Sequence, residues 1–130
     1  MPVWVPTTGG TLFIASGPDG DHLFVLVYSR VLDGRGPENQ FLLVPFCSVD
    51  GARYCDEACI VRAGEHSFIK NVSYLSYRDA QLQTSAHLEN LVNKGIYRPH
   101  DQVTDELLKK IRTGLTVSSR TKNFIKLVSW

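Results

Sequence analysis

Long apolar runs separated by short polar turns fill the first two-thirds of the chain. Residues 22–29 (HLFVLVYS) and 40–46 (QFLLVPF) are apolar at nearly every position. Runs of this length are typical of β-strands whose two faces are both buried. Three shorter segments are predicted as further strands: 11–15, 59–62 and 73–78. Pro45 has no N–H to give to a sheet, so it predicts a strand end or a bulge.

The period changes to that of α-helices after about residue 85. Ser85 is a candidate N-cap for a helix over 86–93, and Gly95 is placed to end it. Thr104 is a candidate N-cap for a longer helix that reaches about Leu115. The stretch 120–128 predicts a last short helix or a docked tail. The pattern therefore indicates a mainly β protein with α-helices, in which a small barrel or sheet carries helices at its C-terminal end.

Length and composition add a domain count to this pattern. A chain of 130 residues fits one domain, 1–130, that includes the helical segment at about 104–128. The hydrophobic content of 43% and the charged content of 21% are those of an ordinary soluble globular protein. We see no repeat, low-complexity tract or interdomain linker.

The apolar runs, the first residues and the cysteines lead us to expect a cytoplasmic protein with no membrane partner. No apolar run approaches the roughly 18–20 residues of a membrane span. The first residues lack the basic and apolar regions of a signal peptide. The three cysteines are an odd number, which argues against a secreted disulfide framework.

The net charge of +1 conceals an uneven distribution. Up to Val92 there are six Lys and Arg against ten Asp and Glu, whereas from Asn93 onward there are eight against three. The basic final third can attract phosphates or an acidic partner peptide. A solvated helix face explains the same residues equally well.

The segment 64–79 holds the densest group of residues capable of chemistry. Metal-free RNA cleavage needs a base for the 2′-hydroxyl, an acid for the leaving 5′-oxygen and donors for the phosphate charge. His66 can supply the acid or base, and Lys70 and Arg78 can bind the phosphate. Three further residues can position RNA or stack on its bases: Ser73, Tyr74 and Tyr77. Packing and solvation offer a plain structural explanation for the same residues.

The cysteines raise two alternative chemistries. Together with His66 they form a nominal zinc ligand set: Cys47, Cys55 and Cys59. The spacings are not those of a zinc knuckle, and free cysteine commonly behaves as a small buried apolar residue. A nucleophilic Cys47 or Cys55 activated by His66 is a further alternative. The residues imply no cofactor and no metal.

The order of motifs resembles the MazF/PemK toxin family, whose fold is the small SH3-like barrel also seen in CcdB. The matching segments are a first strand at 11–15, an apolar strand ending in serine at 22–29, and a valine-proline strand ending in a hydroxyl residue at 43–48. The segment 73–82, a Lys94-Gly95 turn and a closing helix at 104–115 follow. The motifs are short and span most of the chain.

The resemblance implies a cytosolic, metal-independent endoribonuclease of a toxin–antitoxin system. Members of the family cleave single-stranded RNA, act as homodimers and are neutralised by an antitoxin protein. By the resemblance, Ser48 would contact the scissile phosphate. The family arginine that precedes the second strand is absent here, where His22 and Leu23 stand. His22 or His66 would then take over part of its work.

Two rival functions remain open at this point. The same barrel fold could serve as a non-catalytic module that binds a protein or a nucleic acid, as in an accessory or phage-derived protein. A regulator stabilised by zinc through the cysteines and His66 is the other.

Overall fold

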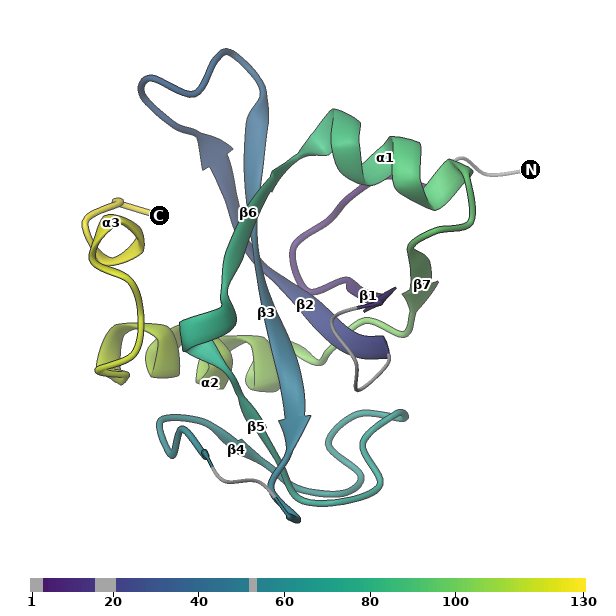
Figure 1. The fold of residues 1–130 in the computed structure, drawn as a ribbon, viewed down its shortest axis with the longest axis vertical. Coiled ribbons are helices and arrows are strands. Elements are labelled where there is room, and N and C mark those ends of the chain that lie inside the picture. Colours follow the sequence, from purple (N-terminus) through teal and green to yellow (C-terminus); the bar gives the residue numbers. More distant parts are fainter. Residues whose placement is uncertain (1–3, 16–20, 52–53) are drawn as a thin grey trace.

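The computed structural model describes residues 4–15, 21–51 and 54–130. It is dominated by an antiparallel sheet with three helices (Figure 1). The strands are β1 (Thr11–Ala15), β2 (Asp21–Val31), β3 (Asn39–Ser48), β4 (Ile60–Val61), β5 (Ser73–Leu75), β6 (Gln81–Thr84) and β7 (Arg98–His100). The helices are α1 (Ser85–Asn93), α2 (Asp105–Val117) and α3 (Asn123–Lys126), with a 3₁₀ turn at Tyr77–Asp79. The prediction of a mainly β protein with α-helices is confirmed.

The described strands pair in the order β4-β5-β3-β2-β1-β7, and β6 also pairs with β3. This order has two ends, β4 and β7, so the seven-stranded sheet is not closed by hydrogen bonds. β3 is the central strand. It lies against β2 along one edge, and against β6 and then β5 along the other.

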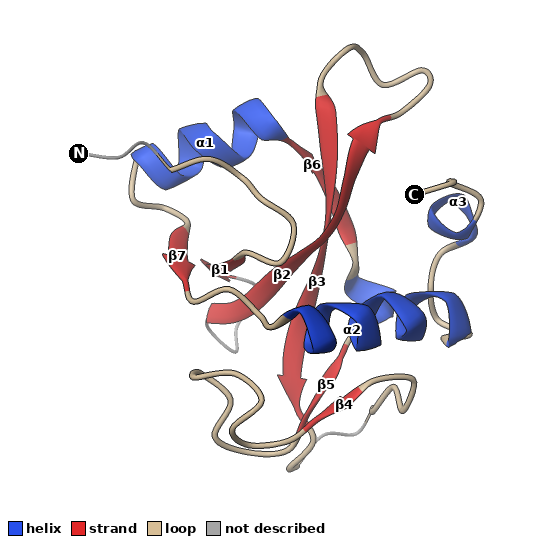
Figure 2. Ribbon diagram, turned by 180° about the vertical axis from the view of Figure 1, so that it is seen from behind, coloured by secondary structure: helices blue, strands red, loops and turns tan. Residues whose placement is uncertain are grey.

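The two long strands are buried on both faces, as their continuous apolar runs predict. Alternate residues of a strand point to opposite sides of a sheet. Val25 and Val44 therefore join the cluster that includes Ile111 of α2, whereas Phe24 and Leu43 join a second cluster beneath α1. Figures 1 and 2 show α2 crossing one side of the long strands, whereas α1 continues from the end of β6.

Pro45 lies inside β3, contrary to the predicted strand end or bulge. The pairing of β3 with β6 ends at Leu43, and the pairing with β5 begins at Phe46. The proline therefore occupies the position where β3 exchanges one neighbour for another, and its missing N–H breaks neither ladder. The irregularity in the register belongs to β2, between Leu26 and Tyr28.

Both long helices begin at a threonine cap. The Oγ1 of Thr104 accepts the Leu107 N–H at 3.1 Å, as predicted. For α1 the cap is Thr84, whose Oγ1 accepts the His87 N–H at 3.1 Å, so the prediction of Ser85 is wrong by one residue. Gly95 follows α1 with φ = 73°, the left-handed conformation expected of a residue that ends a helix.

Three features of the chain differ from the sequence prediction. The strand predicted over 73–78 stops at Leu75 and turns into the 3₁₀ segment. β6 and β7 were not predicted, because the stretches 81–84 and 98–100 carry few apolar residues.

None of the helices in the described part of the chain is both long and apolar enough to cross a membrane.

Candidate functional site

A groove lies where the start of β2 meets the end of β3. The two strands are antiparallel, with Phe24 opposite Pro45, so His22 is carried toward Cys47 and Ser48. The loop before β5 closes the other side with Lys70 and Asn71. The resulting pocket has a volume of about 390 Å³. Three residues predicted from different parts of the sequence, His22, Ser48 and Lys70, thus line one groove.

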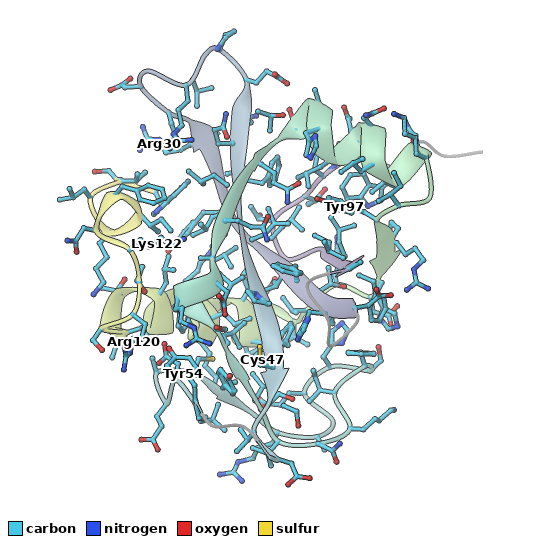
Figure 3. The ribbon with its side chains drawn as sticks, in the orientation of Figure 1. Arg30, Cys47, Tyr54, Tyr97, Arg120 and Lys122 are labelled. Atoms are coloured by element: carbon cyan, nitrogen blue, oxygen red, sulfur yellow. The ribbon has the colours of Figure 1, made fainter. Side chains whose placement is uncertain are left out.

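A second pocket of about 320 Å³ adjoins the first. His22 and Cys47 line both, and the second is completed by Phe24, Pro45, Asp79 and Gln81. The two pockets therefore meet at His22 and Cys47. Figure 3 shows Cys47 near the end of β3.

His66 is a buried residue of the loop before β5 and is not among the residues that line either pocket. Its Nδ1 accepts the Phe68 N–H at 3.0 Å, and its Nε2 lies 2.7 Å from the Asp101 carbonyl oxygen. An Nδ1 that accepts leaves the ring proton on Nε2, which then donates to that carbonyl. Both nitrogens are engaged, so acid–base work by His66 would require these bonds to break. The imidazole that the structure brings into the groove is that of His22.

The loop that His66 anchors is held by further local contacts. The Ile69 N–H donates to the His66 carbonyl at 3.0 Å, and the Gly64 N–H donates to the Ile69 carbonyl at 3.3 Å. The hydroxyl of Ser67 donates to the Asp101 carboxylate, and this bond lowers the pKa of Asp101. The loop thereby presents Phe68 and Lys70 to the groove from a fixed frame.

The three predicted substrate-binding residues lie mostly inside the protein. Ser73 lines the groove, but its hydroxyl donates to the Asn71 carbonyl at 3.0 Å. Tyr74 is 5% exposed. Tyr77 is fully buried, and its hydroxyl donates to the Ile111 carbonyl at 2.7 Å. Tyr77 therefore has no surface for stacking on a base in this structure, because its segment turns into the core after β5.

Cys47 is a neutral thiol packed against Tyr74. Burial is the main cause that raises the pKa of Cys47, whereas its hydrogen bond with Tyr74 opposes the rise. Burial likewise raises the pKa of Tyr74 to about 12. The pKa of Cys55 is raised as well, again mainly by burial. A nucleophilic cysteine needs a thiolate, so neither the pKa of these thiols nor the engaged ring of His66 favours the cysteine mechanism.

Arg78 lies outside the main groove. Its guanidinium carbon is 3.8 Å from the centre of the Tyr54 ring, and its Nε is 3.6 Å from the Asp79 carboxylate. Arg120 approaches the same ring at 5.4 Å. Arg78 therefore pairs with Asp79, which lines the second pocket, and does not join Lys70 as the sequence suggested.

The cysteines and His66 do not converge on a metal. Throughout 4–15, 21–51 and 54–130, no three His, Cys, Asp or Glu side chains form a group that could hold an ion. All three cysteines are free thiols. The zinc hypothesis fails on this geometry, since Cys59 is buried in the core beside Tyr77 while His66 lies in the loop.

Sequence reasoning missed the site residues Asn71, Asp79 and Gln81. Asn71 lies next to Lys70 in the printed sequence and belongs to the polar segment 64–79, so proximity was the signal that could have found it. Gln81 carried no signal, because its place depends on the pairing of β6 with β3. Comparisons with known proteins add nothing to this list, since neither a protein-family model nor a curated protein matches the chain.

Proposed function

We propose that the groove around His22 binds single-stranded RNA and cleaves it without a metal ion. The observation that supports this is the meeting of His22, Ser48 and Lys70 in one pocket, although they belong to three separate segments. The set combines an imidazole for proton transfer, an ammonium for phosphate charge and a hydroxyl donor. Asn71 adds an amide that can donate to a phosphate oxygen.

The reaction follows from these roles. The imidazole of His22 takes the proton of the 2′-hydroxyl, whose oxygen attacks the adjacent phosphorus. The bond from phosphorus to the 5′-oxygen breaks, and the imidazolium returns its proton to that oxygen. Lys70 and the donors of Ser48 and Asn71 stabilise the charge that builds on the phosphate. The products are a 2′,3′-cyclic phosphate and a 5′-hydroxyl.

We extend the proposal to the hypothesis, drawn from the family resemblance, that this chain is a toxin. The sheet would be the open form of a small SH3-like barrel, supported by the way β3 pairs with both β5 and β6 along one edge. The protein would act in the cytoplasm as a homodimer, as the toxin of a toxin–antitoxin system, and an antitoxin would neutralise it. Growth arrest on expression, relieved by His22→Ala, would support this reading.

Cleavage of labelled single-stranded RNA in EDTA tests the chemistry. We expect new ends that carry a cyclic phosphate and a 5′-hydroxyl. His22→Ala should lower kcat/KM by about 10²–10⁴, the usual contribution of an acid–base group. Lys70→Ala should lower it by at least about tenfold. Lys94→Ala, which removes an exposed cation beyond α1, is the matched control and should leave the rate unchanged.

A non-catalytic binding module is the second candidate. The inward position of His66 and Tyr77 favours it, because both are engaged in internal hydrogen bonds. A protein that binds RNA tightly but leaves every RNA intact in the cleavage experiment would be this module. An equal cleavage rate in wild type and His22→Ala would instead move the active site elsewhere.

A further inference from the structure

A second groove lies at the far end of β2, away from His22. It is formed between the β2–β3 hairpin and the C-terminal segment, and its volume is about 430 Å³. Arg30 lies eight residues beyond His22 on the same strand, which separates them by about 26 Å at the usual strand rise. Figures 1 and 2 both show α3 and the C-terminus beside the hairpin. We refer to this groove, between residues 30–35 and 124–129, as the hairpin groove.

The walls of the hairpin groove are held together by specific contacts. The Arg30 guanidinium donates to the Ser129 carbonyl. Next to the groove, the rings of Tyr28 and Trp130 stack at 5.5 Å with an angle of 9° between their planes. Arg35 lies over the ring of Phe124 at 5.7 Å. The groove is therefore a built feature of the fold rather than a gap beside a loose tail.

Large apolar side chains are exposed along this groove. Leu127 is 83% exposed, Val31 49% and Phe124 46%. Apolar groups gathered in this way on a surface mark an interaction site more often than scattered single residues do. Among the described strands, none pairs with the outer edge of β2 beyond Leu26, because β1 begins at Thr11, opposite Val25.

More cations than carboxylates lie around the hairpin groove. The C-terminal segment 118–130 contains three Lys and Arg and no Asp or Glu. Arg30 and Arg35 add two cations from the hairpin, against the single carboxylate of Asp33 among the lining residues. Figure 3 shows Arg30, Lys122 and Arg120 along the margin of the molecule that carries α3. An occupant must therefore bring negative charge together with apolar side chains.

We propose that the hairpin groove binds an extended acidic peptide segment of a partner protein, in which aliphatic residues alternate with Asp or Glu. The aliphatic side chains would cover Val31 and Leu127, and the carboxylates would meet Arg30 and Arg35. Single-stranded RNA fits less well, because bases prefer open aromatic faces. Four of the nine residues that line the groove are aliphatic, and its ring at Phe124 already has Arg35 over it. The inference stands on this groove alone, whether or not the His22 groove cleaves RNA.

The test measures binding of a fluorescent twelve-residue peptide of alternating Glu and Leu to the full chain by anisotropy. Wild type should bind it at least ten times more tightly than a peptide with Gln in place of Glu, or one with Ser in place of Leu. The double variant Arg35→Glu with Leu127→Ser should weaken binding at least tenfold. The matched control, Lys94→Glu with Ile96→Ser, makes the same changes of charge and apolar exposure beyond α1 and should change binding less than twofold.

Three results would overturn the proposal. They are equal affinity for the Glu and Gln peptides, equal weakening by the two double variants, and tighter binding of a twelve-nucleotide RNA that only the Arg35 and Leu127 variant loses. RNA cleavage by that variant should equal wild type, since neither residue lines the His22 groove. If wild type cleaves RNA but does not bind the peptide, only the hairpin-groove proposal fails. If it binds the peptide but does not cleave RNA, only the proposed function fails.

Discussion

Gly114 permits the close approach of α2 to the core. A Cβ at this position would lie 2.9 Å from Cζ of Tyr77 and 3.0 Å from Cβ of Cys59. Neither neighbour can withdraw easily, because Tyr77 is fully buried and its hydroxyl bonds the Ile111 carbonyl. Glycine is unfavourable in a helix interior, but packing requires it at this position.

We predict that Gly114→Ala lowers the free energy of unfolding by about 1–3 kcal/mol, the usual cost of overpacking a core. This loss should exceed the gain of about 1 kcal/mol that alanine brings to a helix interior. Urea unfolding measures the difference. Thr116→Ala, at an exposed position of the same helix, should be neutral or stabilising. A Gly114→Ala variant more stable than wild type would show that Tyr77 can move aside.

The helices α1 and α2 begin with the same type of N-cap. In each, a threonine accepts the N–H of the residue three positions later, Thr84 from His87 and Thr104 from Leu107. Asp105 and Glu106 add negative charge at the start of α2, whereas the first turn of α1 has no acidic residue. The hydroxyl of Thr84 is therefore the main local support for the start of α1.

We predict that Thr84→Ala costs about 1 kcal/mol of stability, as loss of an N-cap usually does. Ser85→Ala should cost less than half of this, because Ser85 is already the first residue of the helix. Guanidinium denaturation of both variants gives the comparison, with Thr84→Ser retaining most of the stability. The opposite order of the two alanine variants would restore Ser85 as the cap.

At the scale of the whole molecule, His66 ties together segments that are far apart in the chain. It lies 35 residues before Asp101 in sequence, yet its Nε2 bonds that carbonyl at 2.7 Å. The same ring lies near His100, with centres 5.4 Å apart, and near Phe46, at 6.4 Å. One side chain thus joins the groove loop to the end of β3 and to the connection before α2.

We predict that His66→Ala lowers the free energy of unfolding by about 1–3 kcal/mol, because the Phe68 N–H loses its acceptor and the Asp101 carbonyl keeps only the Thr11 hydroxyl as a partner. Thermal unfolding measures the loss. His87→Ala, at an exposed position of α1, should cost less than about 0.5 kcal/mol.

The same variant separates a supporting role from a catalytic one. At a temperature where it is folded, His66→Ala should raise KM for RNA and change kcat less than about tenfold, in contrast to the 10²–10⁴ of an acid–base group. A loss of kcat as large as that of His22→Ala would assign proton transfer to His66, as the sequence first suggested.

The sequence alone determined the elements that depend on a run of apolar residues along the chain or on the chemistry of a helix end. The continuous apolar runs at 22–29 and 40–46 required burial on both faces and so predicted β2 and β3. Thr104 and Gly95 carried the chemistry of helix ends in their own side chain or backbone, and the structure uses both as predicted. The nearby polar residues of the groove loop, Lys70 among them, were also visible as a group.

Only the tertiary structure decided which residues meet. Gln81 and Thr84 lie in a strand because β3 pairs with them, and no local pattern marks them as such. His22 and Ser48 share a groove because β2 and β3 are antiparallel, whereas His66 and Tyr77 turn inward to hydrogen-bond with carbonyls over 30 residues away. Strand pairing and long-range hydrogen bonds depend on contacts between distant segments, which the order of residues in one segment does not contain.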